Sequence, residues 1–307
     1  MRYTQYPFDV PQEKIVRVIT NTDAKNEADD QFAIAQALLS PKMEHVGLIA
    51  AHFGTRRTAQ SMEESYQELE TVLDTMGFAS QGLLYRGAAQ ALPDAVTPVD
   101  SEGARLIIRE AMAADARPLF VTFLGPLTDL ASAYLLEPRI AGRLTAIWIG
   151  GGAYPEGGVE FNLSNDIHAA NVVFASGIEV WQVPKNVYEM MAVSLVELEA
   201  RVRPCGAIGH YLCQQLHEHA HTAQPRGNPF RSGETWVLGD NPAVGLILYE
   251  HRFCFEWRCA PQINADMTYH HTGRNRPIRV YQSIDSRLIL EDMYAKLRLF
   301  ADASAPG

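Results

Sequence analysis

Apolar and polar residues alternate in blocks along the chain, and these blocks predict strands and helices in turn. Short runs rich in β-branched and aromatic residues are typical of buried strands, while apolar residues spaced three and four apart indicate helices. The expected strands cover residues 15–19, 46–51, 83–85, 119–124, 145–149 and 179–183, and the expected helices cover 32–38, a polar stretch ending near 76, 103–114, 125–136 and 168–176. This alternation predicts an α/β fold with a doubly wound, mostly parallel sheet flanked by helices.

The last third of the chain departs from this alternation. Residues 195–225 have a helical pattern and are rich in His, and an apolar helix is expected at 243–249. Runs at 253–258 and 278–282 predict an antiparallel strand pair, and 286–299 predicts a final helix. Because no Gly/Ser-rich linker, charge block or repeat divides the sequence, we expect residues 1–307 to form a single domain.

The turn after the first strand carries four carboxylates within eight residues, Asp23, Glu27, Asp29 and Asp30. In an open α/β sheet this turn lies at the carboxyl edge of the strands, where ligands bind. Carboxylates this close repel one another without a counter-charge, and Ca²⁺ and Mg²⁺ take oxygen ligands of this kind. The alternative is a solvated acidic helix N-terminus, where carboxylates interact favourably with the helix dipole. Lys25 at the third position and the lack of glycine exclude an EF-hand and a phosphate-binding glycine loop.

Composition narrows the possible partners and location. The chain has 307 residues, of which 47% are hydrophobic, and a formal net charge of −10 that argues against nucleic acid or an anionic membrane as a partner. Residues 1–14 lack the apolar core of a secretory signal, and no apolar run approaches the roughly 20 residues of a membrane span. The four cysteines have no CxxC spacing and suit reduced thiols. We therefore expect a cytoplasmic protein.

Four groups of polar residues follow expected strands, and together they would converge on one pocket. They are Asn21-Thr22-Asp23 with Asp29-Asp30; Leu124-Gly125-Pro126-Leu127-Thr128-Asp129; Gly151-Gly152-Ala153 with Glu160-Phe161-Asn162 and Asp166; and Gly239-Asp240-Asn241-Pro242-Ala243-Val244. In order and type these groups resemble the motifs of inosine–uridine-type nucleoside hydrolases. That family opens with D-T-D-P-G-x-D-D, and its second motif ends in G-P-L-T-N.

The resemblance implies a Rossmann-like nucleoside hydrolase fold that binds one Ca²⁺ and hydrolyses the N-glycosidic bond of ribonucleosides. The products would be ribose and a free base, as in purine or pyrimidine salvage, and the protein would be a homodimer or homotetramer. By motif position, Asp23 would ligate calcium and act as general base on the metal-bound water, with Asp30, the Leu124 carbonyl and Asp240 as further ligands. Asp29, Glu160 and Asn162 would hold the ribose hydroxyls.

The chain also departs from the family motifs at several positions. Asn21 replaces the usual first Asp, and the acidic turn is two residues longer, so Asn26 or Glu27 could enter the site. Gly239 replaces a His that is thought to protonate the leaving base in part of the family. The family's ribose-contacting Asn after the second strand has no clear match, and His52, Thr55 or Arg56 occupies that region. Candidate replacements for the acid are His52, Tyr188, His217, His219, His221, Tyr269, His270 and His271.

Two other interpretations match part of the sequence. A phosphatase of the haloacid-dehalogenase type needs an Asp nucleophile two residues before a second Asp, and Asn21 occupies that position. A nucleoside- or ribose-binding protein of the same fold with weak or no catalysis remains open, because the family His is absent and the acidic turn is stretched. A retained Asp23 with a full set of ligands favours catalysis, because a cation and a base suffice for the attack of water.

Overall fold

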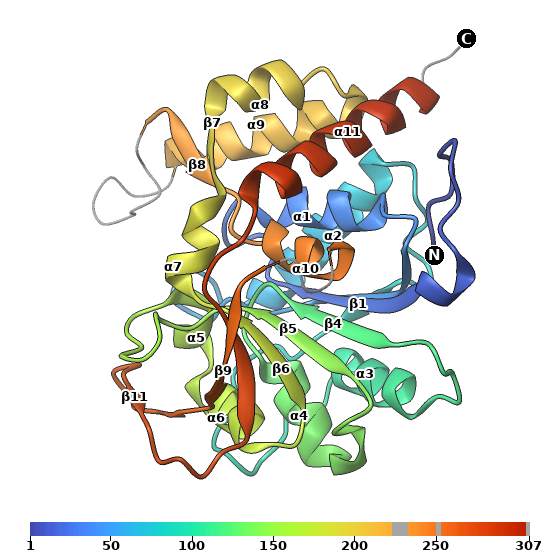
Figure 1. The fold of residues 1–307 in the computed structure, drawn as a ribbon. Coiled ribbons are helices and arrows are strands. Elements are labelled where there is room, and N and C mark those ends of the chain that lie inside the picture. The colour runs from blue at the N-terminus through green and yellow to red at the C-terminus, as the bar shows by residue number, and fades with distance from the viewer. Residues whose placement is uncertain (223–232, 250–252, 305–307) are drawn as a thin grey trace.

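The computed structural model describes residues 1–222, 233–249 and 253–304, and it has one large sheet between two layers of helices (Figure 1). The sheet has eight strands in the order β3-β2-β1-β4-β5-β6-β12-β9, and all neighbours are parallel except β12 and β9. These strands are β3 Leu84–Arg86, β2 Met43–Ala50, β1 Val16–Thr22, β4 Leu119–Phe123, β5 Thr145–Ile149, β6 Glu179–Val183, β12 Pro277–Tyr281 and β9 Phe255–Cys259. The predicted doubly wound α/β fold is therefore confirmed.

Strand β1 lies at the point where the strand order reverses. It pairs in parallel with β2 on one side, where Val18 faces His45, and with β4 on the other, where Val18 faces Phe120. The helices that follow β1 and β4 lie on opposite faces of the sheet, so the turns after these two strands diverge (Figure 1). Crevices at such switch points are the usual ligand sites of open α/β sheets.

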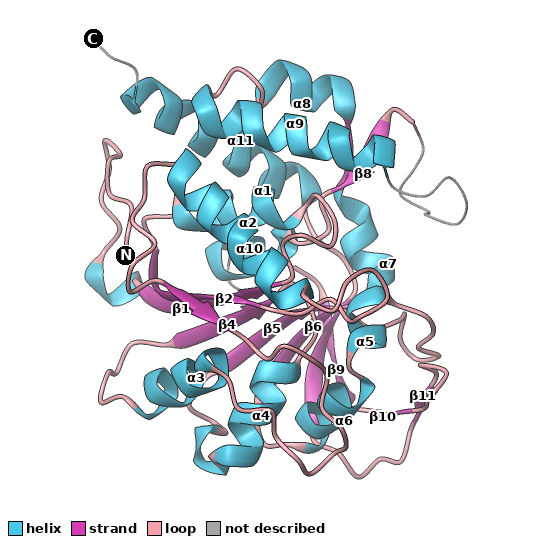
Figure 2. Cartoon of the chain, turned by 180° about the vertical axis from the view of Figure 1, so that it is seen from behind, coloured by secondary structure: helices cyan, strands magenta, loops and turns pink. Residues whose placement is uncertain are grey.

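Each face of the sheet is covered by helices (Figure 2). One layer contains α3 Glu102–Met112, α4 Thr128–Leu136 and α6 Ile167–Ala175; the other contains α1 Asp30–Leu38, α2 Ser61–Thr75, α8 Leu195–Arg201, α9 Gly206–Thr222, α10 Asn241–Leu248 and α11 Ser286–Ser304. Each layer packs its own cluster of buried apolar side chains against the sheet. Burying a large apolar side chain stabilises the fold by about 1.5–3 kcal/mol, so these two clusters supply most of the driving force.

Helix α1 is buried along its whole length, because the helices α2, α10 and α11 and the strand β2 all pack against it. All nine of its residues are buried, and they include the polar side chains of Gln31 and Gln36. The Gln36 amide donates to the Ile289 carbonyl on α11, and Asn241 of α10 donates to the Gln36 carbonyl oxygen, both near 3 Å. These bonds fix α1 and α10 side by side, with their N-termini at the same edge of the sheet.

The observed elements follow the sequence expectations closely, including the antiparallel pair in the last third, in which Ile278 faces Arg258. The His-rich stretch is two helices rather than one, because Pro204 and the left-handed Gly206 (φ 67°) separate α8 from α9. Short elements that the pattern did not predict are α5 Phe161–Asn165, α7 Lys185–Tyr188, β7 Ala192–Ser194, β8 Thr235–Val237, β10 Gln262–Ile263, β11 Tyr269–His270 and the 3₁₀ turns Gln12–Lys14, Pro138–Ile140 and Glu189–Met191. Across the part of the chain described, no helix is long and apolar enough to cross a membrane.

Candidate active site

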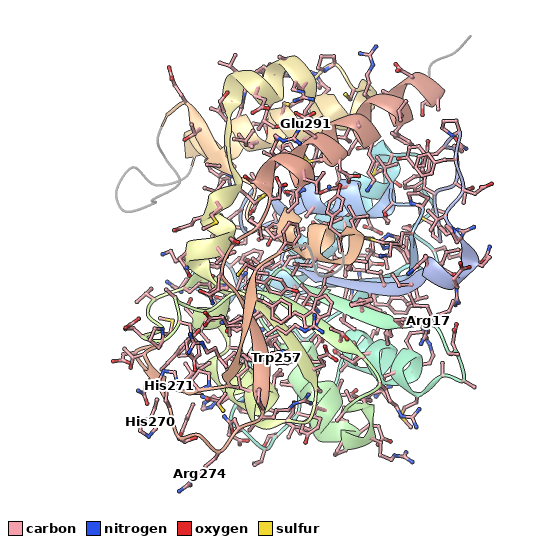
Figure 3. The ribbon with its side chains drawn as sticks, in the orientation of Figure 1. Arg17, Trp257, His270, His271, Arg274 and Glu291 are labelled. Atoms are coloured by element: carbon pink, nitrogen blue, oxygen red, sulfur yellow. The ribbon has the colours of Figure 1, made fainter. Side chains whose placement is uncertain are left out.

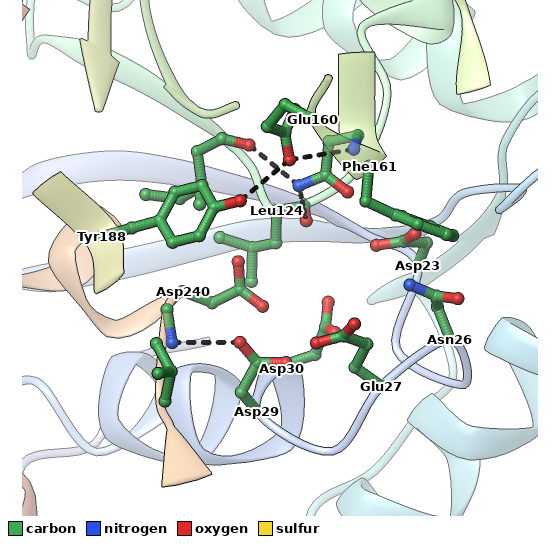
Figure 4. Close-up of a pocket in the computed structure, with 14 residues that line it drawn as sticks. Asp23, Asn26, Glu27, Asp29, Asp30, Leu124, Glu160, Phe161, Tyr188 and Asp240 are labelled. Atoms are coloured by element: carbon green, nitrogen blue, oxygen red, sulfur yellow. Dashed lines mark hydrogen bonds between the residues drawn. The ribbon is translucent and has the colours of Figure 1, made fainter. Parts of the chain in front are cut away.

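A pocket with about 420 Å³ of empty space opens at the switch point, at the carboxyl ends of β1, β4 and β5 (Figure 4). Its lining is rich in carboxylates and comes from six separate segments of the chain. The lining residues are Asp23, Asn26, Glu27, Asp29, Asp30, Leu124, Ile149, Glu160, Phe161, Asn162, Tyr188, Val237, Gly239 and Asp240. The structure therefore brings together every predicted site residue except His52.

The turn between β1 and α1 supplies the floor of the pocket. Asp29 is the N-cap residue of α1 and accepts a hydrogen bond from the Gly239 N–H at 3.0 Å. Asp30 begins the helix, and the Thr22 hydroxyl at the end of β1 donates to its carboxylate. Asp23 is 1% exposed, yet its Oδ2 has no hydrogen-bond partner among the described residues. One buried carboxylate oxygen is thus left for a ligand.

The carboxylate of Asp240 joins this floor from the other end of the chain. Asp240 is the N-cap residue of α10, the helix that packs beside α1. Carboxylate oxygens of Asp29, Asp30 and Asp240 lie within 4.8 Å of one another, a spacing at which a single cation can contact all three. The tightest set therefore contains Asp29, which the family motifs would assign to the ribose, while Asp23 lies beside it.

The proximity of these carboxylates raises their pKa values. Burial, followed by repulsion from Asp29, raises the pKa of Asp30 to about 8, and burial raises the pKa of Asp29 to about 6. The pKa values of Asp23 and Asp240 are also well above the usual range, because of burial and then of their carboxylate neighbours. A cation among them would lower all four pKa values, since it favours the ionised forms.

Gly125 allows the carboxylate of Asp23 to lie against the end of β4. A Cβ on Gly125 would come within 2.8 Å of Asp23 Oδ1 and within 2.9 Å of Asp23 Cγ. Real Cβ atoms essentially never approach other atoms this closely, so any side chain at position 125 would displace Asp23. The glycine of the Leu124-Gly125-Pro126 motif therefore has a packing role at the site.

Glu160 and Asn162 form the wall of the pocket opposite the acidic turn. Glu160 is the N-cap residue of α5, and it accepts bonds from the backbone N–H groups of Gly151 and Leu163 and from the Tyr188 hydroxyl. The Asn162 amide donates to the carbonyls at the ends of β4 and β5, those of Leu124 and Ile149, both at 2.9 Å. The wall is thus held by hydrogen bonds that do not need a ligand.

Tyr188 takes the space beside Gly239 that a side chain there would need. A Cβ on Gly239 would lie 3.1 Å from Tyr188 Cδ2 and 3.3 Å from Asp29 Oδ2. The Tyr188 hydroxyl is 3.1 Å from Glu160 Oε1, and burial followed by the charge of Glu160 raises its pKa well above the usual value. The hydroxyl therefore stays protonated and donates its hydrogen to Glu160.

A buried carboxylate behind the pocket holds the extended turn in place. Glu68 of α2 accepts bonds from Lys25 (2.6 Å), Gln31 (3.0 Å) and Tyr211 of α9 (2.5 Å). Gln31 also donates to the Ala24 carbonyl. Helices α2 and α9 therefore fix the turn that presents Asn26 and Glu27 to the pocket. No motif within one segment predicts this network, because its members lie far apart in the chain.

The other candidate residues have different surroundings. His52 is 1% exposed, and its Nε2 lies 2.8 Å from the Thr128 hydroxyl while its Nδ1 accepts from the Gly54 N–H. Burial lowers its pKa to about 4, so it is a neutral core residue outside the pocket lining. His270, His271 and Arg274 lie at the outer edge of the molecule (Figure 3). The side chain of His221 lies outside the described residues.

Comparisons with known proteins identify the family of the chain. The profile described as "Inosine-uridine preferring nucleoside hydrolase" matches residues 18–291. The chain belongs to this family. The nucleoside hydrolase is 26% identical to a probable uridine nucleosidase 2 from Arabidopsis thaliana, over 65% of this chain and 68% of that protein. It is 28% identical to an inosine-uridine preferring nucleoside hydrolase from Leishmania major, over 58% of this chain and 63% of that protein.

Solved structures show the same fold at lower identity. A purine-preferring ribonucleoside hydrolase from Gardnerella vaginalis superimposes with a TM-score of 0.77 and 18% identity, over 94% of this chain and all of the other. A plant nucleoside hydrolase superimposes with a TM-score of 0.75 and 19% identity, over 92% of this chain and 99% of the other. The predicted family, and with it the N-glycosyl hydrolase class of enzyme, is confirmed by the family match and the relatives.

Two departures of this nucleoside hydrolase from the family motifs lie in contact. Asn21 stands where the opening motif has Asp, and Asp129 stands where the second motif ends in Asn. Asn21 Nδ2 donates to Asp129 Oδ2 at 2.8 Å, and both side chains are buried. Asp129 Oδ1 accepts from the Ala88 N–H and the Ser101 hydroxyl. Compared with the family motifs, the amide and the carboxylate therefore stand at each other's positions across one hydrogen bond. The pair still contains a single carboxylate.

Proposed function

We propose that the chain catalyses calcium-dependent hydrolysis of the N-glycosidic bond of ribonucleosides, giving ribose and a free base, with Asp23 as the general base. The observation that carries this proposal is the free Oδ2 of Asp23. It is buried, lies beside the cluster of Asp29, Asp30 and Asp240, and has no hydrogen-bond partner among the described residues. Such an oxygen can accept a proton from a water molecule held in the pocket.

The donor set fits a hard divalent cation. Asp30, Asp240, Asp23 and the Leu124 carbonyl offer oxygen ligands and would hold Ca²⁺, with Asp29 close by. The Leu124 carbonyl accepts from Asn162 and keeps a second lone pair. The ion would supply positive charge that lowers the pKa of a nearby water molecule.

The wall and the extended turn would position the sugar. Asp29, Glu160, Asn162 and Asn26 surround the floor, and their oxygen and nitrogen atoms can bind the ribose hydroxyls. Carboxylates around the sugar also stabilise the positive charge that develops on an oxocarbenium-like transition state. Hydrolysis of the bond to the base therefore needs a water molecule, a proton acceptor and negatively charged groups around the sugar, and the pocket can provide all three.

The test is release of free base from a panel of purine and pyrimidine ribonucleosides, with EDTA and with added calcium. Release that EDTA stops and calcium restores, with magnesium less effective, supports the proposal. If no member of the panel is hydrolysed and calorimetry still detects ribose or nucleoside binding, the chain is a binding protein of the same fold.

Three further expectations remain predictions. We propose that residues 1–307 act as one domain, in a homodimer or homotetramer, and light scattering after size exclusion would measure the assembly. A cytoplasmic location and a role in purine or pyrimidine salvage rest on the sequence and on the family.

A further inference from the structure

We propose that this pocket favours ribonucleosides whose base carries a positive charge, such as N-alkylated purinium or pyridinium ribosides. This inference rests on the proposed hydrolysis and adds the class of base. It follows from four features of the pocket: the charge of its lining, the carboxylate of Glu27, two aromatic rings in the lining, and the lack of a proton donor at positions 188 and 239.

The ionisable side chains of the lining are almost all carboxylates. Among the described residues, the lining contains six carboxylates and no Lys, Arg or His: Asp23, Glu27, Asp29, Asp30, Glu160 and Asp240. A divalent cation would offset two of these negative charges. The remaining negative potential attracts a cationic ligand and repels an anionic one.

Glu27 is the carboxylate best placed to meet a charged base. Asp29, Asp30 and Glu160 each accept a hydrogen bond from the protein, whereas no hydrogen bond or ion pair to Glu27 occurs within the described ranges. Its side chain is half-buried and points from the extended turn into the pocket beside Asp30 (Figure 4). Burial, followed by repulsion from Asp29 and Asp30, raises the pKa of Glu27, and a cationic base beside it would favour its ionised form. The ammonium of Lys185 acts in the same direction as such a base but is outside the lining.

Two aromatic rings line the same space. Phe161 and Tyr188 both line the pocket, and the face of an aromatic ring attracts a cation through its quadrupole. Phe161 already has one such neighbour, because the guanidinium carbon of Arg56 lies 5.8 Å from its ring centroid. A flat cationic heterocycle could stack on these rings while Glu27 neutralises its charge.

The wall at positions 188 and 239 offers no proton to a departing base. Gly239 has no side chain, and the Tyr188 hydroxyl donates to Glu160. A neutral purine leaves as an anion unless it is protonated, so its departure is slow at such a wall. A cationic base needs no proton. Water attacks C1′ and loses one proton to Asp23, and the electron pair of the broken C1′–N bond neutralises the ring, so the base leaves as a neutral molecule.

Three ribosides separate the two parts of this inference. Guanosine is neutral and its base needs a proton to leave; 7-methylguanosine is cationic and its base does not; 4-nitrophenyl riboside is neutral and its phenolate leaves without a proton. With calcium present, we expect kcat/KM for 7-methylguanosine and for 4-nitrophenyl riboside to exceed that for guanosine by at least about a hundredfold, because general acid catalysis contributes 10²–10⁴ in rate. Equal rates for guanosine and 7-methylguanosine would overturn the inference and leave the hydrolase proposal intact. Hydrolysis of none of the three would overturn both.

The variant Glu27→Gln tests the recognition of charge. We expect the ratio of kcat/KM for 7-methylguanosine to kcat/KM for 4-nitrophenyl riboside to fall about tenfold. The matched control is Glu189→Gln, which removes a carboxylate next to Tyr188 but outside the lining, and it should leave this ratio unchanged.

Calorimetry in the Asp23→Asn background gives a second measurement, of binding. We expect 7-methylguanosine to bind at least tenfold more tightly than guanosine, and Glu27→Gln to remove this difference. If Glu27→Gln changes neither the ratio of kcat/KM nor the difference in affinity, Glu27 does not recognise the charge of the base.

Discussion

The exchanged pair Asn21 and Asp129 predicts a stability cycle that can be worked out from the structure. Asn21→Asp would place two carboxylates 2.8 Å apart at a site where both side chains are buried. One hydrogen bond would be lost, and either two buried charges would repel each other or one would have to take up a proton. Breaking a buried charged contact of this kind costs about 3–5 kcal/mol of folding free energy.

The reverse single change should cost much less. In Asp129→Asn, the new amide oxygen can still accept from the Ala88 N–H and the Ser101 hydroxyl, and its NH₂ group can donate to Asn21. Asn21 Oδ1 has no partner at present, so a flip of the Asn21 amide would provide the acceptor. The number of hydrogen bonds is then preserved, and we expect a loss of about 1 kcal/mol, typical of one altered polar contact.

The double variant Asn21→Asp with Asp129→Asn restores one amide and one carboxylate across the same contact. Its free energy of unfolding should return to within about 1–2 kcal/mol of the parent, which corresponds to a coupling energy of about −2 to −5 kcal/mol between the two sites. Urea unfolding of the four proteins at pH 7, followed by circular dichroism, measures the cycle. If Asn21→Asp costs less than 1 kcal/mol, or if the double variant is no more stable than Asn21→Asp alone, the pair is not a compensating exchange.

Three further predictions concern the site itself. Asp23→Asn should lower kcat at least about a hundredfold, the usual contribution of a general base, while calorimetry still detects the nucleoside; near-normal turnover would rule out the base role. Gly125→Ala should lower kcat without unfolding the chain, because its Cβ displaces Asp23, and Gly142→Ala, which has open space but a positive φ, is the control for backbone strain. In EDTA, the raised pKa values of Asp29 and Asp30 mean that the folded form holds protons more tightly than the unfolded form, so stability should fall between about pH 4 and pH 8. Saturating calcium should abolish this fall, and a calcium-insensitive Tm across that range would contradict the assigned cation site.

Much of the fold could be predicted because its strands are continuous apolar runs. Strands β4 and β5, with sequences LFVTF and TAIWI, are covered on both faces, so nearly every position is apolar and the pattern is unambiguous. Short elements such as α7 and β7 were missed, because four or three residues are too few for a period to show. The break between α8 and α9 could have been inferred from Pro204 and Gly206.

The part of the site that lies within single continuous segments of the chain could be predicted from the sequence. The acidic turn and the polar residues after the strands predict nine site residues, and eight of these nine line the pocket. His52 also follows a strand, but its side chain packs against Thr128 in the core, and the position of a residue after a strand does not fix the direction of its side chain. The contact of Tyr188 with Gly239 and the bonds to Glu68 join distant segments, so a pattern within one segment contains no trace of them.

The joining of α1 to α10 at the pocket has a consequence for how the chain folds. The Gly239 N–H reaches Asp29 across 210 positions, so the three-carboxylate cluster is absent until the last third of the chain has docked on the first. Closing so long a loop is entropically costly, and contacts of this kind are typically made late. Binding of a divalent ion would therefore report the completed fold and would draw the equilibrium toward it. A chain that stops before α10 could build most of the sheet and still have no site to fill.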